Sequence, residues 1–477
     1  MNEFMWNCFS PIFKEISSIY QVSDLSVTML SLSYMIIFAP ASFLFVYIQV
    51  RYGLRKTLII GATLQAIGGF IRYLSCLLLQ ANTDKNNVSS GYFGLLMIGQ
   101  IFAAFAQPVF TNLPPLISTT WFPAHERNRA TITMVMANPI GNALGSLVPG
   151  LVIPVLTMSS TENDKDHIRS NLVYFAFAQA ILATIIATGI IVTVQDKPPT
   201  PPSAAAAVRE EKITETLSSL PTSSSSYTKL MDTEEEQLLD TSKSSSSLPS
   251  SSSSAAKLAL SKLYNEYKLL YQNKNFLYLL IGFGIGLGTF NAILALLGQI
   301  VSPCGYTSTQ AGITGGILLG SGLLTSGIIG TYLEKSKALV PVLRISIIIA
   351  LIMLTIFLIF LRPNIPIGLY ITSGILGAAV VPILPVGLEN AAECTYPILE
   401  DTSASAMTMF GKYLGVIITF ILQPLLSLSM VSTCSTIFTP TAGIILGLLI
   451  ISAVCIYRFQ KDYRRQQTET VYVNNEK

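Results

Sequence analysis

One lysine stands inside a long apolar stretch, TSASAMTMFGKYLGVIITF, which runs from Thr402. Lys412 is the only charged residue between Asp401 and Arg458. An ionisable group in a membrane helix costs at least about 2.5–3.5 kcal/mol on insertion scales and usually faces a cavity. Lys412 is about ten residues, or about 15 Å, from Thr402, which is too deep for easy snorkelling. We therefore predict that Lys412 lines a pocket or pathway, with structural pairing between helices as the alternative. In a pocket it would pair with an anionic substrate group, titrate as a coupling proton site or substitute for a bound cation.

Two further charges lie in apolar surroundings. Glu3 precedes Trp6 by three residues, which places both on one face of a helix. A Glu3–Lys412 pair is one hypothesis, and simple exposure of Glu3 at the chain start is the alternative. Arg72, in Phe70-Ile-Arg-Tyr, is expected to snorkel toward the outer interface, with a coupling or gating role as the alternative.

No pattern typical of catalysis or metal binding accompanies these charges. The two histidines, His125 and His167, are far apart, and the six cysteines show no CxxC spacing. We find no Ser/His/Asp set and no nucleotide-binding loop, and therefore predict no enzyme, cofactor, metal or nucleic-acid partner. Cys304 and Cys434 would both lie at the outer face, where they could form a disulfide.

The elements that must position these residues are membrane helices. The chain is 51% hydrophobic and only 12% charged, whereas soluble domains have about 25% charged residues. Period-two alternation is absent, so the spans are helical and the chain is an all-α membrane protein in a lipid bilayer. Eleven complete spans are predicted near 27–50, 57–80, 92–117, 131–156, 171–194, 274–301, 310–333, 341–361, 367–390, 403–429 and 438–457.

An incomplete span, residues 1–13, opens the chain and supplies about half a crossing. We expect a first helix that is truncated by missing upstream residues, the alternative being a native start inside that helix. A serine-rich and acidic segment, 195–273, is predicted to be a disordered cytoplasmic linker, with a short amphipathic helix over 258–271. It divides the chain into an N-terminal half (1–194) and a C-terminal half (274–457) of six helices each, followed by a tail (458–477).

Lysine and arginine counts in the short loops put both termini in the cytoplasm. The glycosylation sequon at Asn87 then falls on the outer face. Within the linker, an acidic dileucine pattern at Leu238-Leu239 predicts a sorting adaptor as a partner. We expect the plasma membrane as the location, with an endolysosomal membrane as the alternative.

Two basic loops occupy corresponding places in the halves and indicate an internal duplication. Gly330-x-x-x-Glu334-Lys335-x-Lys337 resembles the G-x-x-x-D-R-x-[RK] loop of the major facilitator superfamily, and Trp121-Phe-Pro-Ala-His-Glu-Arg resembles its W-F-P-x-x-E-R loop. In the first copy, Arg51, Gly53 and Arg55 match, but Val50 stands where an acid is usual. The resemblance implies the major facilitator fold.

More specific stretches resemble the feline leukaemia virus subgroup C receptor-related family, solute carrier family 49. They are Gln100-Ile-Phe-Ala-Ala-Phe-Ala-Gln107-Pro, Asn112-Leu-Pro-Pro, Ala137-Asn-Pro-Ile-Gly and Leu388-Glu-Asn-Ala-Ala-Glu-Cys-Thr-Tyr-Pro. Pro198-Pro-Thr-Pro-Pro-Ser and Leu297-Gly-Gln-Ile resemble the member 3 branch most. The resemblance implies transport of choline and ethanolamine, haem or pyridoxine.

In the choline-transporting members, an aromatic and glutamine pocket lies at the membrane midplane. The resemblance places Trp6 and Gln107 at matching positions, whereas Asn291 replaces the second aromatic residue and Lys412 replaces the second glutamine. The sequence thus predicts four substrate-binding residues, two from each half.

The remaining residues considered for coupling or gating lie nearer the helix ends. Glu389 and Glu393 match acids of the family, and structural pairing with Arg127 or Arg129 competes with substrate contact. The full set for coupling or gating is Glu3, Arg72, Glu389, Glu393, Arg51, Arg55, Glu334 and Lys335.

These residues predict a carrier that works by alternating access. Its small-molecule substrate is expected to be a choline- or ethanolamine-like amine, or haem. An anionic or zwitterionic metabolite held by Lys412 is the alternative, as is a non-transporting receptor or sensor on a carrier fold.

Overall fold

The computed structural model describes residues 1–82, 89–156, 161–196, 198, 266–336, 338–363, 365–396, 398, 400–428 and 439–461. Several predictions fall on residues outside these ranges: the sequon at Asn87, the dileucine at Leu238-Leu239 and the cysteine at Cys434. Most of the linker, most of the tail and most of the predicted helix over 258–271 also lie outside them. Residues 266–272, within and just beyond that predicted helix, are helical.

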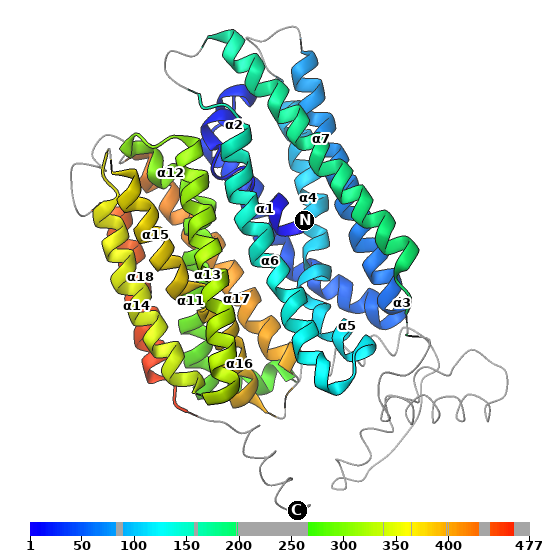
Figure 1. Cartoon of the computed structure of the whole chain (residues 1–477), viewed down its shortest axis with the longest axis vertical. Helices are drawn as coiled ribbons and strands as arrows, with labels where there is room; N and C mark the ends of the chain where they lie inside the picture. Colours follow the sequence, from blue (N-terminus) through cyan, green and yellow to red (C-terminus); the bar gives the residue numbers. More distant parts are fainter. Residues whose placement is uncertain are drawn as a thin grey trace, which may run out of the picture.

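The helices form two bundles that stand side by side (Figure 1). The first contains α1 (Asn2–Asn7), α2 (Phe13–Tyr20), α3 (Asp24–Ala81), α4 (Ser90–Asn112), α5 (Pro114–Trp121), α6 (Ala124–Val152) and α7 (Glu162–Thr193). The second contains α11 (Lys274–Ala295), α12 (Leu297–Val301), a 3-10 turn (Ser302–Cys304), α13 (Ser308–Ser336), α14 (Leu339–Phe360), α15 (Pro366–Val380), α16 (Ile383–Thr395), α17 (Glu400–Leu428) and α18 (Pro440–Arg458). The described residues contain no strand, which confirms the all-α prediction.

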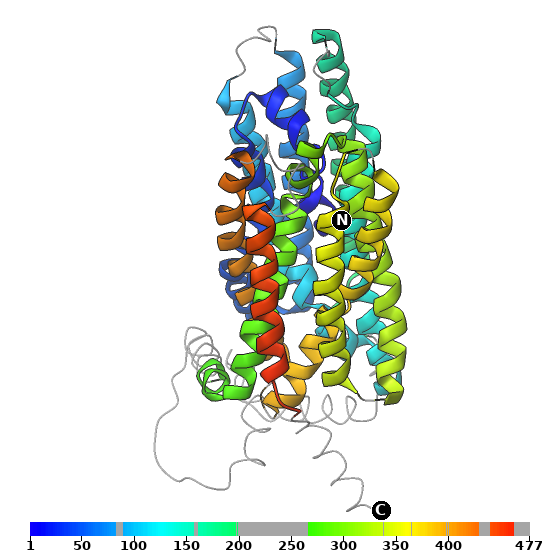
Figure 2. The ribbon, with the colours of Figure 1, turned by 90° about the vertical axis from the view of Figure 1, so that its left-hand side faces the viewer.

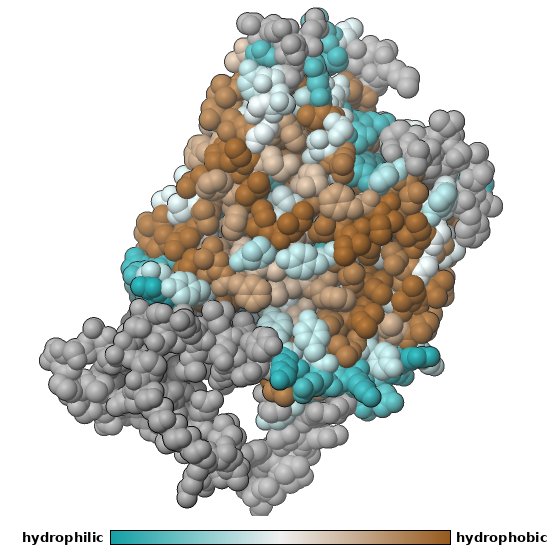
Figure 3. Space-filling model, turned by 180° about the vertical axis from the view of Figure 1, so that it is seen from behind, coloured by the Kyte–Doolittle hydropathy of each residue, from teal (hydrophilic) through white to brown (hydrophobic). Residues whose placement is uncertain are grey.

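The described residues contain 11 helical segments long and apolar enough to cross a membrane, which agrees with the sequence. The long α3 supplies two of them, Asp24–Gln49 and Arg51–Ala81, while α15 and α16 together form a single one, Pro366–Thr395. On the face seen in Figure 3, a wide apolar band crosses the molecule, with hydrophilic residues gathered toward both ends. This band is the surface that lipid would cover.

The start of the chain is two short helices rather than one continuous half-span. Helix α1 ends at Asn7, and Pro11 separates it from α2, because proline lacks the N–H that a continuing helix needs. Both helices are buried inside the bundle, with Met5 and Ile12 fully covered. The first residue lies at mid-height (Figures 1 and 2).

Close helix contacts depend on small residues. A Cβ on Gly312 of α13 would stand 3.2 Å from the Cα of Gly150 in α6, so only glycine permits this contact between the halves. Inside the second half, Gly288 of α11 packs in the same way against Gly411 and Gly415 of α17. In both places the glycines allow two helices to approach closely.

A sharp bend at Gly53 separates the two spans of α3. Gly53 has φ +85°, a left-handed conformation that favours glycine. The Asp196 carboxylate, from just beyond α7, accepts a 2.9 Å hydrogen bond from the Arg55 N–H at the start of the second span. A carboxylate at a helix N-terminus is favourable. Asp196 thus supplies a negative charge at this loop, in which Val50 stands at the position where an acidic residue is usual in the superfamily.

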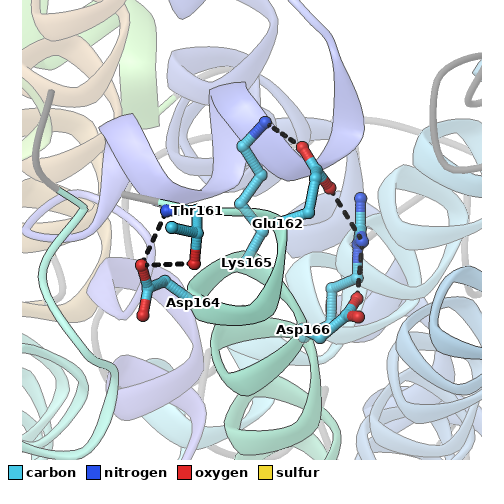
Figure 4. Close-up of polar contacts among 6 residues, drawn as sticks. Thr161, Glu162, Asp164, Lys165 and Asp166 are labelled. Carbon is cyan, nitrogen blue, oxygen red and sulfur yellow. Dashed lines mark hydrogen bonds and ion pairs between the residues drawn. The ribbon is translucent and has the colours of Figure 1, made fainter. Parts of the chain in front are cut away.

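The beginning of α7 is fixed by a charged cluster (Figure 4). The side chain of Asp164 accepts hydrogen bonds from the N–H and hydroxyl of Thr161, closing a capping box. Lys165 lies 2.6 Å from Glu162, and the guanidinium of the buried Arg169 lies 2.8 Å from Asp166. Arg169 is thus a buried cation with a carboxylate partner.

Cys304, at the end of the 3-10 turn, is disulfide-bonded. Because Cys434 lies outside the described residues, their pairing remains a prediction.

Candidate functional site

The first span of α3 gathers the predicted pocket residues along one face. The Trp6 indole N–H donates a 3.0 Å hydrogen bond to the backbone carbonyl of Ser31. One turn further, the Met35 sulfur packs against Gly415 of α17, which also lies beside the Cβ of Asn291. At the next turn, the Lys412 ammonium lies 3.6 Å from the centroid of the Phe38 ring.

Lys412 is also hydrogen-bonded across the two halves. Its Nζ donates a 2.8 Å bond to Gln107 Oε1, and the Gln107 Nε2 donates a 2.8 Å bond to Glu3 Oε1. The predicted relation between Glu3 and Lys412 therefore exists through the amide of Gln107, which lies between the two charges. We call these three residues the Glu3–Gln107–Lys412 chain.

The surroundings explain why this charge is tolerated inside an apolar helix. Hydrogen bonds to charged groups contribute about 1.5–3 kcal/mol each, and a cation over an aromatic face adds about 0.5–2 kcal/mol. Together these are comparable to the insertion penalty of a lysine. The Lys412 nitrogen points to the interior, so it does not snorkel to an interface.

The structure corrects the expectation for Arg72. Its side chain is 1% exposed, and its guanidinium lies 3.0 Å from Cys8 Sγ and 4.7 Å from the centroid of the Phe9 ring. Snorkelling is wrong here because the side chain turns inward from α3 to the end of α1.

A cavity of about 290 Å³ lies inside the first half. Its polar lining comes from Asn2, Glu3, Gln65 and Asn138, and the rest is mostly apolar. Of the predicted site residues, Glu3 alone lines it. The cavity is therefore distinct from the contact between halves around Lys412, although the Glu3–Gln107–Lys412 chain connects the two.

One functional residue was missed by the sequence analysis. Glu15 of α2 is 1% exposed, and its carboxylate accepts bonds of 2.6 and 2.8 Å from the Ser308 hydroxyl of α13 and of 3.1 Å from the Leu156 N–H. It falls with Ile12, Ile16 and Ile19 in an i, i+3, i+4, i+7 pattern. A carboxylate on an apolar helix face is the signal that could have identified it.

Other bonds join the halves near Glu15. The Gln299 side chain donates a 2.8 Å bond to the Thr28 hydroxyl, and the Ser10 hydroxyl donates a 2.6 Å bond to the carbonyl of Leu294. We call this end of the molecule, with Glu15 and Ser308, the sealed end.

The remaining predicted residues lie away from Lys412. Arg51 is exposed and donates a 2.7 Å bond to the Tyr47 hydroxyl, and Arg55 meets Asp196 through its backbone. Glu389 is half-buried and Glu393 is buried, both on α16. The side chains of Arg127, Glu334 and Lys335 lie outside the described part of the chain, so the pairing predicted for the two glutamates remains a prediction.

Comparisons with known sequences find membrane transporters among the relatives of this chain. The Choline/ethanolamine transporter FLVCR1 of the cat (Felis catus) is 25% identical over 420 residues, which cover 88% of this chain and 64% of that protein. Solute carrier family 49 member A3 of Xenopus tropicalis is 26% identical over 463 residues, covering 96% of this chain and 82% of that protein. This chain thus spans less than two-thirds of the cat transporter. The matches support solute carrier family 49, and their similar identities do not single out the member 3 branch.

Solved structures show the same fold. A D-xylose-proton symporter superposes with a TM-score of 0.68 at 14% identity, covering 97% of this chain and 95% of the symporter. A bacterial homologue of the human lysosomal transporter Spinster gives a TM-score of 0.61 at 12% identity, covering 96% and 93%. The profile of the Major Facilitator Superfamily matches residues 1–393. This match over most of the chain shows that the chain belongs to the Major Facilitator Superfamily.

Proposed function

We propose that the chain is a membrane carrier that moves a small organic solute by alternating access. The observation that carries the proposal is the 2.8 Å bond between Lys412 of α17 and Gln107 of α4, which joins the two halves. Carriers of this type hold their solute between halves that rock against each other. A polar contact that must break and re-form during this motion is suited to respond to the solute. The proposal is transport rather than catalysis.

For the solute, we propose a small amine of the choline or ethanolamine class, which is the class in the names of several relatives. Phe38 supports this choice, because its ring already holds a cation, and aromatic faces bind ammonium groups. An incoming amine would take the place of the Lys412 ammonium on this ring.

A second candidate follows from the same contact. Because the Lys412 ammonium already occupies Phe38, a solute that carries an acidic group could pair with Lys412 instead of displacing it. This favours a zwitterionic or anionic metabolite. Haem, which carries carboxylates, is the other cargo that the family resemblance implies.

Uptake by cells expressing the chain separates the candidates. Radiolabelled choline, ethanolamine, a zwitterionic amino acid and haem would be compared in the wild type, Lys412→Gln and Lys412→Arg. An amine carrier keeps or gains uptake in Lys412→Gln, whereas a carrier of acidic solutes loses it there and retains part in Lys412→Arg. Lys56→Gln changes an exposed loop lysine and serves as the control. Absence of uptake of every probe, with normal surface expression, would support the receptor or sensor alternative.

We place the protein in the plasma membrane, with an endolysosomal membrane reached through a sorting adaptor at Leu238-Leu239. Replacing both leucines by alanine should raise the surface level at least about twofold, and an unchanged level would dismiss the signal.

A further inference from the structure

Arg72 is a buried cation without a counter-charge among the described residues. One guanidinium nitrogen, Nη2, contacts Cys8 Sγ, and the group lies over the Phe9 ring. The other two nitrogens, Nε and Nη1, have no hydrogen-bond partner. A neutral thiol and an aromatic face leave the charge as a whole uncompensated.

Two other cations inside the protein are compensated, Arg169 of this half and Lys412 of the second half. Arg169, 4% exposed, has the Asp166 carboxylate at 2.8 Å, and Lys412 is connected to Glu3 through Gln107. Burying an ion without a partner costs several kcal/mol, while the cation–π contact to Phe9 offsets about 2 kcal/mol. The position of Arg72 therefore calls for an anion.

Two unpartnered polar side chains lie on the segments beside this arginine. The Tyr34 hydroxyl is fully buried without a hydrogen-bond partner, one helical turn beyond Leu30, whose carbonyl accepts a bond from Gln100, the residue after Gly99. Asn7, next to Cys8 in the chain, is also fully buried, and both its amide nitrogen and its oxygen are unpaired. Because buried polar groups are normally bonded, the two unpaired guanidinium nitrogens and the unpaired groups on the neighbouring segments indicate a site for an acceptor.

The arginine is held in this position by its neighbour on α4. A Cβ on Gly99 would stand 2.8 Å from the Arg72 Cγ, so glycine is required for the arginine stem to pass between α3 and α4. The guanidinium then reaches the segment just after α1, at Cys8 and Phe9.

We propose that Arg72 and Tyr34 bind a small monovalent anion, a halide or a carboxylate, inside the first half. The guanidinium supplies the charge and two N–H donors, and the Tyr34 hydroxyl supplies a third donor. This site uses none of the Glu3–Gln107–Lys412 chain, so it stands whether or not the proposed solute is correct.

Thermal unfolding of the purified full chain tests this proposal. Chloride, bromide or formate would replace gluconate, which is too large for the site, at constant ionic strength. We expect a saturable rise in the unfolding midpoint, produced by the halides if the site is a halide site and by formate if it is a carboxylate site. Arg72→Gln should weaken the apparent affinity for that anion at least tenfold, whereas Arg169→Gln, the other buried arginine, should leave it unchanged.

Tyr34→Phe provides an independent measurement if Arg72→Gln does not fold. It removes only an unpartnered hydroxyl, so the fold should persist while the apparent affinity falls several-fold. Two results would overturn the proposal: no saturable effect of any small anion on the wild type, or an effect whose half-maximal concentration is the same in Tyr34→Phe and in every folded Arg72 variant.

Discussion

The Glu15 carboxylate and the Ser308 hydroxyl, 293 positions apart in the chain, form a buried 2.6 Å hydrogen bond between the two halves. The same carboxylate accepts the Leu156 N–H, so it connects its own helix α2 to two other parts of the sealed end, α13 and the segment after α6. A charge-assisted bond in such surroundings is among the strongest polar contacts in a protein. In a carrier of this fold, it would stabilise the state in which this end is closed.

Glu15→Gln should therefore shift the chain toward a state open at the sealed end. The amide keeps the shape of the carboxylate but loses the charge, and hydrogen bonds to charged groups contribute about 1.5–3 kcal/mol. We expect the closed population to fall about tenfold or more relative to the open one. The measurement is the distance between spin labels at Asn163→Cys and Ile367→Cys, both exposed, in the presence and absence of the substitution.

Thr28→Val is the matched control, because it removes the neutral bond from Gln299 at the same end. Neutral bonds contribute about 0.5–1.5 kcal/mol, so its shift should be clearly smaller. Equal distance distributions for Glu15→Gln and the wild type would show that Glu15 does not hold this end closed.

The glycine contact between α6 and α13 predicts a second way to open the sealed end. In Gly312→Leu, the new side chain would meet the Gly150 Cα and the Ser146 carbonyl, and overpacking costs about 1–3 kcal/mol. Gly320→Leu on the same helix has no atom within 4 Å of its Cβ and should change little. Both variants would be measured with the spin-label pair, and the prediction fails if the two give the same result.

The spans could be predicted from the sequence because their signal is local. Eleven apolar stretches of suitable length need no knowledge of tertiary contacts, and all of them recur in the structure. The two-half organisation followed from the polar segment between them. The short helices at the start were not separated, because half a span gives little periodicity and Pro11 alone does not tell where each helix ends.

The candidate site was predicted by residue type more than by geometry. Lys412 was named from its isolated charge in an apolar span and Gln107 from the family resemblance, and the structure brings them together. Arg72 was misjudged because depth along a helix does not reveal which face it occupies, and burial depends on the packing of α1 against α3. Glu15 was overlooked because its partners, Ser308 and Leu156, are far away in the chain.

The bend in α3 makes a prediction about stability. Gly53→Ala forces a side chain into a left-handed conformation, which costs about 1–2 kcal/mol, and places its Cβ 3.0 Å from the Asp196 carboxylate oxygen. Gly189→Ala near the C-terminal end of α7 meets nothing within 4 Å and should be neutral or stabilising by up to about 1 kcal/mol. Thermal unfolding in detergent would show a lower midpoint for the first variant alone, and equal midpoints would contradict the assigned bend.

The Glu3–Gln107–Lys412 chain predicts non-additive effects on stability. Gln107→Leu removes the amide between the two charges and should destabilise the chain by about 3 kcal/mol, because two charge-assisted bonds are lost. When Lys412→Met is already present, the same substitution should be less harmful, since one of those bonds no longer exists. The unfolding midpoints of the four proteins of this cycle measure the coupling.

Gln100→Leu, two turns earlier on α4, is the matched control for this cycle. Gln100 donates to the backbone carbonyls of Met5 and Leu30 and to neither charge, so its effect should add to that of Lys412→Met. Uptake rates should differ in the same way. Gln107→Leu should take up solute at least tenfold more slowly than the wild type, whereas Gln100→Leu should match the wild type once its expression level is taken into account. The coupling energy between Gln107 and Lys412 should exceed the one between Gln100 and Lys412. If the two coupling energies are equal, the 2.8 Å bond between the halves contributes nothing measurable to stability. The solute site would then have to be sought at the cavity beside Glu3.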